Sequence, residues 1–168
     1  MPRPLHACLA AALAGLAIPV AAAPARETLV VRNKWGAFRD ADPPRCFAIA
    51  EPARAGARAA SRMFAPYASI AFWPTRGVRG QLHVRLRRPK LVNAPIMLAI
   101  GEQRFRLIGG GADAWAPDWR VDRAIVAAMR GGTSMSVETR GRDGRGFAEV
   151  YPLRGAATAI DAAALGCR

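Results

Sequence analysis

Lysine, histidine and cysteine are scarce in this chain of 168 residues, which has two histidines and three cysteines. Its lysines are Lys34 and Lys90 alone. The lack of a C-x-x-C motif leaves a redox-active or zinc site with little support. No serine lies in a G-x-S-x-G motif, and the glycine run 109–111 lacks the G-x-G-x-x-G spacing of a nucleotide-binding loop. We therefore predict no metal, no cofactor and no catalytic residue.

The first 25 residues have the pattern of an export signal. Arg3 is the one Lys, Arg, Asp or Glu among residues 1–25, and an apolar core follows it at 9–20. That core is about 12 residues long, whereas a membrane-spanning helix needs roughly 20, so a retained anchor is the weaker alternative. We expect cleavage after Ala23 or Ala25 and a periplasmic or secreted protein of a Gram-negative bacterium.

Residues 26–168 are expected to form a single β-rich domain, and they keep almost all of the net charge of +13. No second apolar segment in the sequence is long enough to cross a membrane. Most of the positive charge is arginine, whose guanidinium group binds phosphate or carboxylate in bidentate fashion. An exported protein of this charge favours anionic lipids or glycans, and the export signal argues against nucleic acid as the partner.

Cys46 and Cys167 lie near the two ends of the expected domain, whereas Cys8 lies in the expected signal. Two cysteines in an oxidising compartment, with no third to compete, most simply pair. A Cys46–Cys167 disulfide closes a loop of about 120 residues, for which the chain-entropy model gives roughly 4–5 kcal/mol. Two buried free thiols are the alternative.

Alternation of apolar and polar side chains with period two predicts half-buried strands. The pattern covers residues 81–87, 103–108, 133–140 and 147–153, with shorter candidates at 35–39, 46–50 and 69–73. Residues 96–100 are apolar throughout, which predicts a central strand covered on both faces. Gly101-Glu102 and Asp143-Gly144 predict hairpin turns between neighbouring strands.

Two short helices are expected among these strands. Asp118 can cap the first, at 119–130, and a glycine pair follows it. The second, at 156–165, is rich in alanine. Surface loops are expected at 52–62 and 109–117. We therefore predict a mainly β fold, an antiparallel β-sandwich or partly closed barrel with two short α-helices.

Several of these motifs occur together in one order along the chain. A helix at 122–130 ends in glycine, a strand follows at 133–139, and a Leu-x-Gly segment at 153–155 precedes the alanine-rich helix. Earlier, a W-G-A-F segment at 35–38 precedes Cys46. This arrangement resembles the invasion-associated locus B family of bacterial envelope proteins.

The resemblance is loose over the expected domain and best over residues 124–163. It implies a secreted or periplasmic protein with no established catalytic residues. The chain departs from the family in the region 109–120, where the family often has further cysteines and this sequence has none.

A basic cluster is the strongest candidate for a binding site, because neighbouring strands could bring its members onto one face. The candidate anion-binding residues are Arg85, Arg87, Arg88, Lys90, Arg104 and Arg106, with Arg76 and Arg79 as further members of that face. A merely solvated basic face is the alternative. Tryptophans at 73, 115 and 119 are expected mostly in core or loop positions, but an exposed one beside arginine suits an interfacial or glycan contact.

We predict a non-enzymatic exported envelope protein that binds an anionic envelope component or a protein partner. The one histidine of the expected domain, His83, alternates with arginines on the polar face of a strand, so we expect a solvated side chain rather than a catalytic base. A structural or assembly subunit of the envelope is one alternative. The other is a small exported hydrolase that uses carboxylates such as Asp40, Asp42, Asp113 and Asp118.

Overall fold

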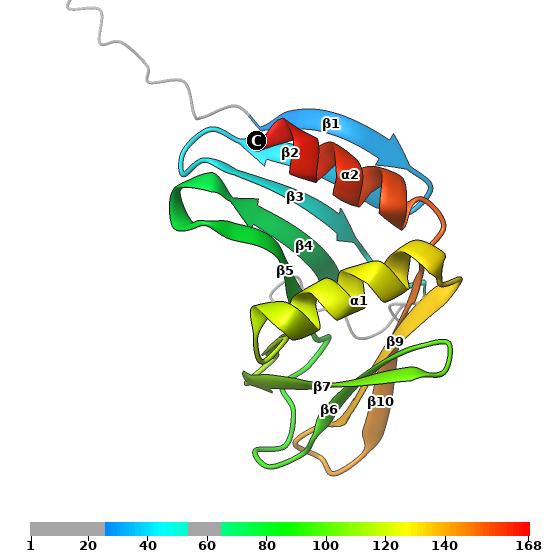
Figure 1. The fold of residues 1–168 in the computed structure, drawn as a ribbon. Helices are drawn as coiled ribbons and strands as arrows, with labels where there is room; N and C mark the ends of the chain where they lie inside the picture. The colour runs from blue at the N-terminus through cyan, green and yellow to red at the C-terminus, as the bar shows by residue number, and fades with distance from the viewer. Residues whose placement is uncertain (1–25, 54–64) are drawn as a thin grey trace, which may run out of the picture.

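A computed structural model describes residues 26–53 and 65–168. Within these residues, ten strands form one continuous antiparallel sheet in the order β1-β2-β3-β4-β5-β8-β7-β6-β9-β10, and its two ends do not close on each other. Two helices, α1 and α2, lie against one side of this sheet (Figure 1). The predicted mainly β, antiparallel fold with two short helices is confirmed. The expected signal peptide, and the loop predicted at 52–62 from residue 54 onward, lie outside the described residues.

The elements have the following bounds: β1 Glu27–Arg32, β2 Trp35–Asp40, β3 Arg45–Ala50, β4 Tyr67–Trp73, η2 Pro74–Arg76, β5 Val78–Arg85, β6 Ile96–Ile100, β7 Gln103–Gly110, β8 Asp113–Trp115, α1 Trp119–Gly131, β9 Ser134–Arg140, β10 Gly146–Pro152 and α2 Ala156–Gly166. Each predicted strand and helix is present near its predicted bounds. Both predicted hairpin turns are present, since β6 pairs with β7 and β9 with β10 on either side of them.

The predicted surface loop at 109–117 is wrong, because it contains β8. Gly109 and Gly110 belong to β7 and pair with β8 across a tight turn. A side chain at Gly109 would place its Cβ 2.1 Å from the carbonyl oxygen of Asp113, so glycine alone permits this approach of the two backbones. The glycines within the predicted loop are therefore what allows the β7–β8 hairpin to form.

Strand β6 is covered on one face, and not on both as predicted. Ile96, Leu98 and Ile100 are buried, while Met97 and Ala99 are only half-buried on the opposite face. A continuous apolar run gives no periodicity from which the number of covered faces can be deduced.

Helix α1 begins where predicted. The side chain of Asp118 accepts hydrogen bonds from the backbone N–H groups of Arg120 and Val121, at 2.8 and 3.0 Å. The helix buries Ile125, Ala128 and Met129 in the core. Its apolar stripe thus faces the sheet and its opposite face is left to solvent.

Helix α2 lies across β1, β2 and β3 (Figure 1). Its buried residues are mostly alanine: Ala156, Ala159, Ile160 and Ala163. Small side chains let a helix backbone approach a sheet closely, so the alanine-rich composition suits this packing. Gly166 extends the effect to the last turn, where an added Cβ would lie 2.7 Å from the side chain of Leu29.

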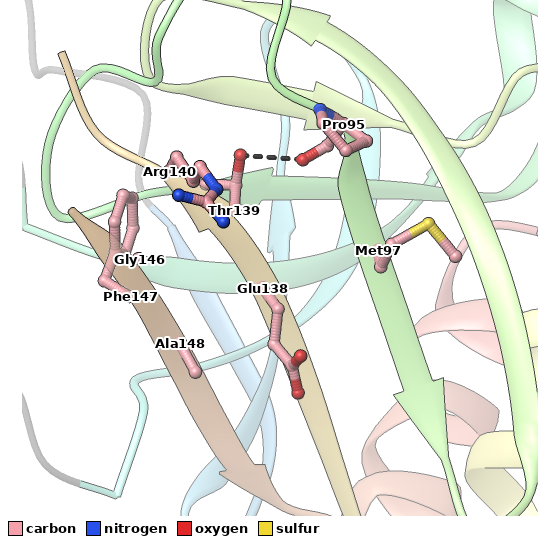
Figure 2. Close-up of a pocket in the computed structure, with 8 residues that line it drawn as sticks. All are labelled: Pro95, Met97, Glu138, Thr139, Arg140, Gly146, Phe147 and Ala148. Atoms are coloured by element: carbon pink, nitrogen blue, oxygen red, sulfur yellow. Dashed lines mark hydrogen bonds between the residues drawn. The ribbon is translucent and has the colours of Figure 1, made fainter. Parts of the chain in front are cut away.

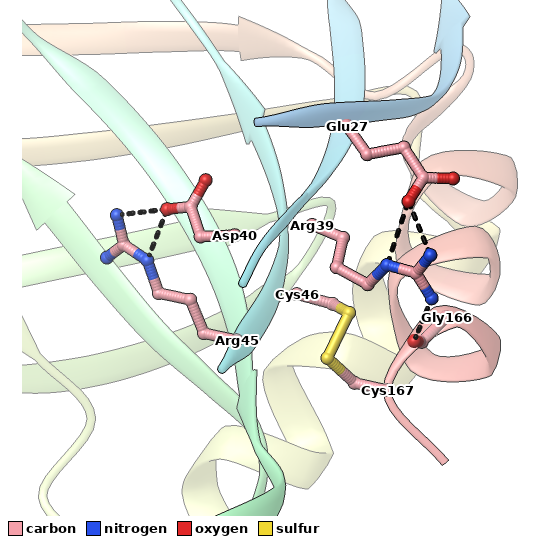
Figure 3. The surroundings of a disulfide bond; sticks show 7 residues. All are labelled: Glu27, Arg39, Asp40, Arg45, Cys46, Gly166 and Cys167. Carbon is pink, nitrogen blue, oxygen red and sulfur yellow. Dashed lines mark hydrogen bonds and ion pairs between the residues drawn. A yellow bond between two sulfur atoms is a disulfide. The ribbon is translucent and has the colours of Figure 1, made fainter. Parts of the chain in front are cut away.

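The predicted disulfide is confirmed. Cys46 of β3 is bonded to Cys167, which follows α2, with the two Cα atoms 5.7 Å apart (Figure 3). Arg39 pairs with Glu27 beside it and also donates to the carbonyl oxygen of Gly166, at 3.5 Å. The end of α2 is therefore held to the sheet by a covalent bond and by polar contacts.

We expect a variant with Cys46→Ser and Cys167→Ser to lose stability, because the bridge joins residues 121 apart and restricts the unfolded chain. The free energy of unfolding should fall by roughly 2–5 kcal/mol. Urea unfolding followed by circular dichroism measures this difference. Reduced wild type should match the variant, and equal midpoints for oxidised wild type and the variant would contradict the prediction.

Candidate functional site

The predicted basic cluster does not form one free positive face. Three of its arginines each have a carboxylate partner, at 2.7, 2.9 and 2.9 Å: Arg85 with Asp113, Arg87 with Glu149 and Arg88 with Asp143. Glu149 is fully buried. Such pairs compensate charge within the fold, so these arginines have structural partners already.

The other members of the cluster lie around the loop before β6 and on β7. Lys90 is buried and its ammonium group donates to the carbonyl oxygens of Leu91 and Val92, at 2.9 and 2.6 Å. Arg104 donates to two carbonyl oxygens in its own hairpin. Arg106 is exposed and lines a cavity with Lys90. Their assignment as an anion-binding site stays a prediction, although most of them have partners inside the chain.

The sheet face away from the helices carries a wide, open cavity of about 530 Å³ over β6, β9 and β10 (Figure 2). Thr139 donates to the carbonyl oxygen of Pro95 at its edge, at 2.8 Å. Glu138 and Arg140 both line it, so the cavity has charges of both signs. It is a poor match for a ligand of one charge sign.

His83 has partners at both ring nitrogens, in contrast to the solvated side chain expected from the sequence. Nε2 lies 2.8 Å from a carboxylate oxygen of Asp113, and Nδ1 lies 3.3 Å from the hydroxyl of Tyr67. The ring of Trp115 stacks on the imidazole, with centroids 5.0 Å apart. The imidazole is therefore held in place by an aspartate, a tyrosine hydroxyl and a stacked indole.

Three carboxylates of the hydrolase alternative have separate roles in the fold. Asp40 pairs with Arg26 and Arg45, and the hydrogen bond from Arg26 is the main reason that its pKa is lowered. Asp113 lies on β8, four strands from β2 in the sheet order, and pairs with His83, whereas Asp118 caps α1. Among the described residues, Asp40, Asp113 and Asp118 thus each have a partner of their own within the fold.

A groove not predicted from the sequence lies where α1 and α2 meet the β4–β5 hairpin. It consists of two neighbouring cavities of about 330 Å³ and about 300 Å³, which share Phe72, Arg79 and Ala164. We call it the α1–α2 groove. Cys167 also lines it, so the disulfide forms part of its wall.

The floor of the α1–α2 groove is apolar. Its lining includes the side chains of Phe72, Val126, Ala127, Ile160 and Ala164. Gly80 lies in one wall and adds no side chain to it. Its φ of +88° favours glycine, and an added Cβ would contact the side chains of Phe72 and Val126 at 3.9 Å. A surface of this composition suits an apolar chain.

The lining of the groove also includes four arginines: Arg79, Arg123, Arg130 and Arg168. Arg130 pairs with Asp161 at 2.6 Å. Within residues 26–53 and 65–168, no ion pair involves Arg79 or Arg123, and both are exposed. The groove thus combines an apolar floor with guanidinium groups that have no carboxylate partner in the described chain.

Asp122 fixes α1 against β5 and so holds two walls of the groove in place. One of its carboxylate oxygens accepts a hydrogen bond from the backbone N–H of Leu82 at 2.8 Å. Burial raises the pKa of Asp122, while that hydrogen bond acts in the opposite direction. The group is half-buried, and its charged form is therefore less favourable than in water.

Sequence reasoning missed the groove because its lining comes from three separate segments, 72–80, 123–130 and 160–168. A partial signal existed in α1. Arg123, Ala127 and Arg130 recur at helical spacing on the face opposite the buried stripe. That spacing could have indicated a basic helix face.

The described residues contain no group of three or more His, Cys, Asp or Glu side chains placed to hold a metal ion. No helix in the described part of the chain has both the length and the apolar composition to span a bilayer. No family model matches the chain, and no curated protein or solved structure matches it. The resemblance to the invasion-associated locus B family therefore stays a prediction.

The role of Asp122 is testable by comparing Asp122→Asn with Asp122→Ala. The amide keeps an acceptor for Leu82, whereas alanine leaves that N–H unsatisfied and should cost about 1–3 kcal/mol of stability at pH 7. Because the folded pKa of Asp122 is raised, ionisation disfavours the fold. The stability of wild type relative to Asp122→Asn should therefore rise as the pH falls through that raised pKa towards 3.8.

Urea titrations of the three proteins at several pH values measure these differences. A constant difference between wild type and Asp122→Asn across the acid range would show that the carboxylate carries no such penalty.

Proposed function

We propose that this protein is a non-enzymatic, exported component of the bacterial envelope that binds an anionic amphiphile. By this we mean a molecule with an apolar chain and a phosphate or carboxylate head. The apolar chain of this ligand occupies the α1–α2 groove, and its anionic head contacts the arginines that line the groove. The observation that carries the proposal is an apolar floor next to Arg79 and Arg123, which lack carboxylate partners in the described residues.

The two parts of such a ligand gain free energy from different sources. Each CH₂ group removed from water contributes about 0.8 kcal/mol. A guanidinium group binds a phosphate with two parallel hydrogen bonds, which are stronger than neutral ones. The groove should therefore favour ligands with both an apolar chain and an anionic head. A ligand with only one of these parts gains only one of the two contributions to the binding free energy.

The compartment is also part of the proposal. A disulfide that joins the end of the chain to the sheet is typical of proteins outside the reducing cytosol. The first 25 residues have the composition of an export signal. The resemblance to the invasion-associated locus B family supports the same location.

Three detergents with equal chains and different heads test the proposal: dodecyl phosphate, dodecylphosphocholine and dodecyl maltoside. Each is titrated below its critical micelle concentration and followed by calorimetry. We expect dodecyl phosphate to bind at least tenfold more tightly than the other two, because only its head is a net anion. Added salt should reduce this preference.

Substitutions in the groove separate the contributions of head and chain. Arg79→Gln with Arg123→Gln should weaken dodecyl phosphate binding at least tenfold, whereas Arg142→Gln in the β9–β10 turn removes a charge elsewhere and should have no effect. Ala164→Phe fills the groove and should weaken the binding of all three detergents. Equal binding of the three heads, or indifference to these groove variants, would overturn the proposal.

A further inference from the structure

Helix α1 has a solvent face that the fold itself does not use. Its buried side chains point to the core, and its exposed side includes Arg120, Arg123 and Arg130. At its first turn, Trp119 is 58% exposed, which is unusual for so large an aromatic side chain. The feature that needs explaining is a tryptophan held in water beside arginines.

Those arginines lie against the indole ring. The guanidinium carbons of Arg120 and Arg123 are 5.0 and 5.6 Å from its centroid. Trp119, Arg120, Arg123 and Ala124 together line a surface hollow. Stacking restricts the arginines and leaves the edges of their guanidinium planes available to an anion.

We infer that α1 docks on the surface of an anionic lipid bilayer, with Trp119 at the headgroup level and Arg120 and Arg123 at lipid phosphates. This inference rests on the proposed function and names where the amphiphile comes from. Indole is enriched at membrane interfaces because it combines an apolar body with a polar N–H. Arginines near an anionic bilayer each strengthen attachment by about fivefold.

The acidic groups of this helix have partners within the fold. Asp118 is engaged as the N-cap, and Asp122 points to the backbone of β5. Asp161 of α2, the neighbouring acid, pairs with Arg130. The carboxylates around α1 therefore have partners within the fold, and Arg120 and Arg123 are the cations next to Trp119.

The docking face and the α1–α2 groove share a residue. Arg123 lines the hollow beside Trp119 and also the groove. Both features include residues of α1, and this helix lies against the sheet on the same side as α2 (Figure 1). Arg123 can therefore contact an anionic head at either place.

Cosedimentation with vesicles tests the inference. The full domain is mixed with vesicles of phosphatidylcholine alone, or of phosphatidylcholine with phosphatidylglycerol, over a salt series. We expect salt-dependent binding to the phosphatidylglycerol vesicles only, with a blue shift of tryptophan fluorescence. Trp119→Phe should lose the blue shift while retaining most of the binding.

Two variants outside the groove give the decisive comparison. Arg120→Gln should weaken vesicle binding about fivefold or more and leave dodecyl phosphate binding unchanged, and Trp119→Ala should weaken vesicle binding by a similar factor. Arg142→Gln is the matched control, and thermal unfolding checks that each variant is folded. If both variants bind the anionic vesicles as tightly as wild type does, the inference is wrong.

The remaining outcomes separate the two proposals. Wild type that binds dodecyl phosphate but not the anionic vesicles refutes the docking inference and leaves the proposed function standing. Wild type that binds neither refutes both.

Discussion

The disulfide between β3 and the end of α2 is the constraint on which the groove depends. Cys46 pairs with Phe72 across the β3–β4 ladder, so the bridge lies next to the phenyl ring at the groove floor. On the other side it fixes Cys167, and with it the last turn of α2. Without the bridge, the wall containing Ala164 would be held by noncovalent packing alone.

The alanines of α2 make this arrangement possible. A helix with larger residues at Ala159 and Ala163 would stand farther from β2 and β3, beyond the reach of a disulfide. Gly166 has the same effect beside Leu29. The small residues of α2 therefore set the distance between the helix and the sheet. That distance in turn permits the Cα separation of 5.7 Å at the disulfide.

Much of the fold could be predicted from local pattern, because half-buried strands and capped helices leave periodic signals. Asp118 and the glycine pair after the helix predicted the two ends of α1 to within one residue. Strand β8 was missed because it has three residues, too few for any period to be visible. Strand β1, at the sheet edge, alternates poorly because both its ends are exposed and its pairing with β2 has an irregularity.

The candidate site was much less predictable, because the partners of a charged residue depend on tertiary structure. Arg85, Arg87 and Arg88 look like a basic cluster in sequence, yet each meets its own carboxylate from a distant strand or turn. Arg79 lies only six residues from Arg85 and has no ion pair in the described residues. Local charge density therefore indicates how basic the surface is, but not where a ligand can bind.

The preference for arginine over lysine has a physical consequence in this fold. Guanidinium carbons lie over aromatic rings at several places, including Arg45 and Arg76 over Trp73 and Arg88 over Phe147. A lysine ammonium is more strongly hydrated and has no planar surface with which to stack on a ring. Stacked guanidinium groups lose less conformational freedom when they bind, and they offer paired N–H donors to an anion. Under the proposed function, Trp119 contributes to anion binding indirectly, because Arg120 and Arg123 lie over its ring before any ligand arrives.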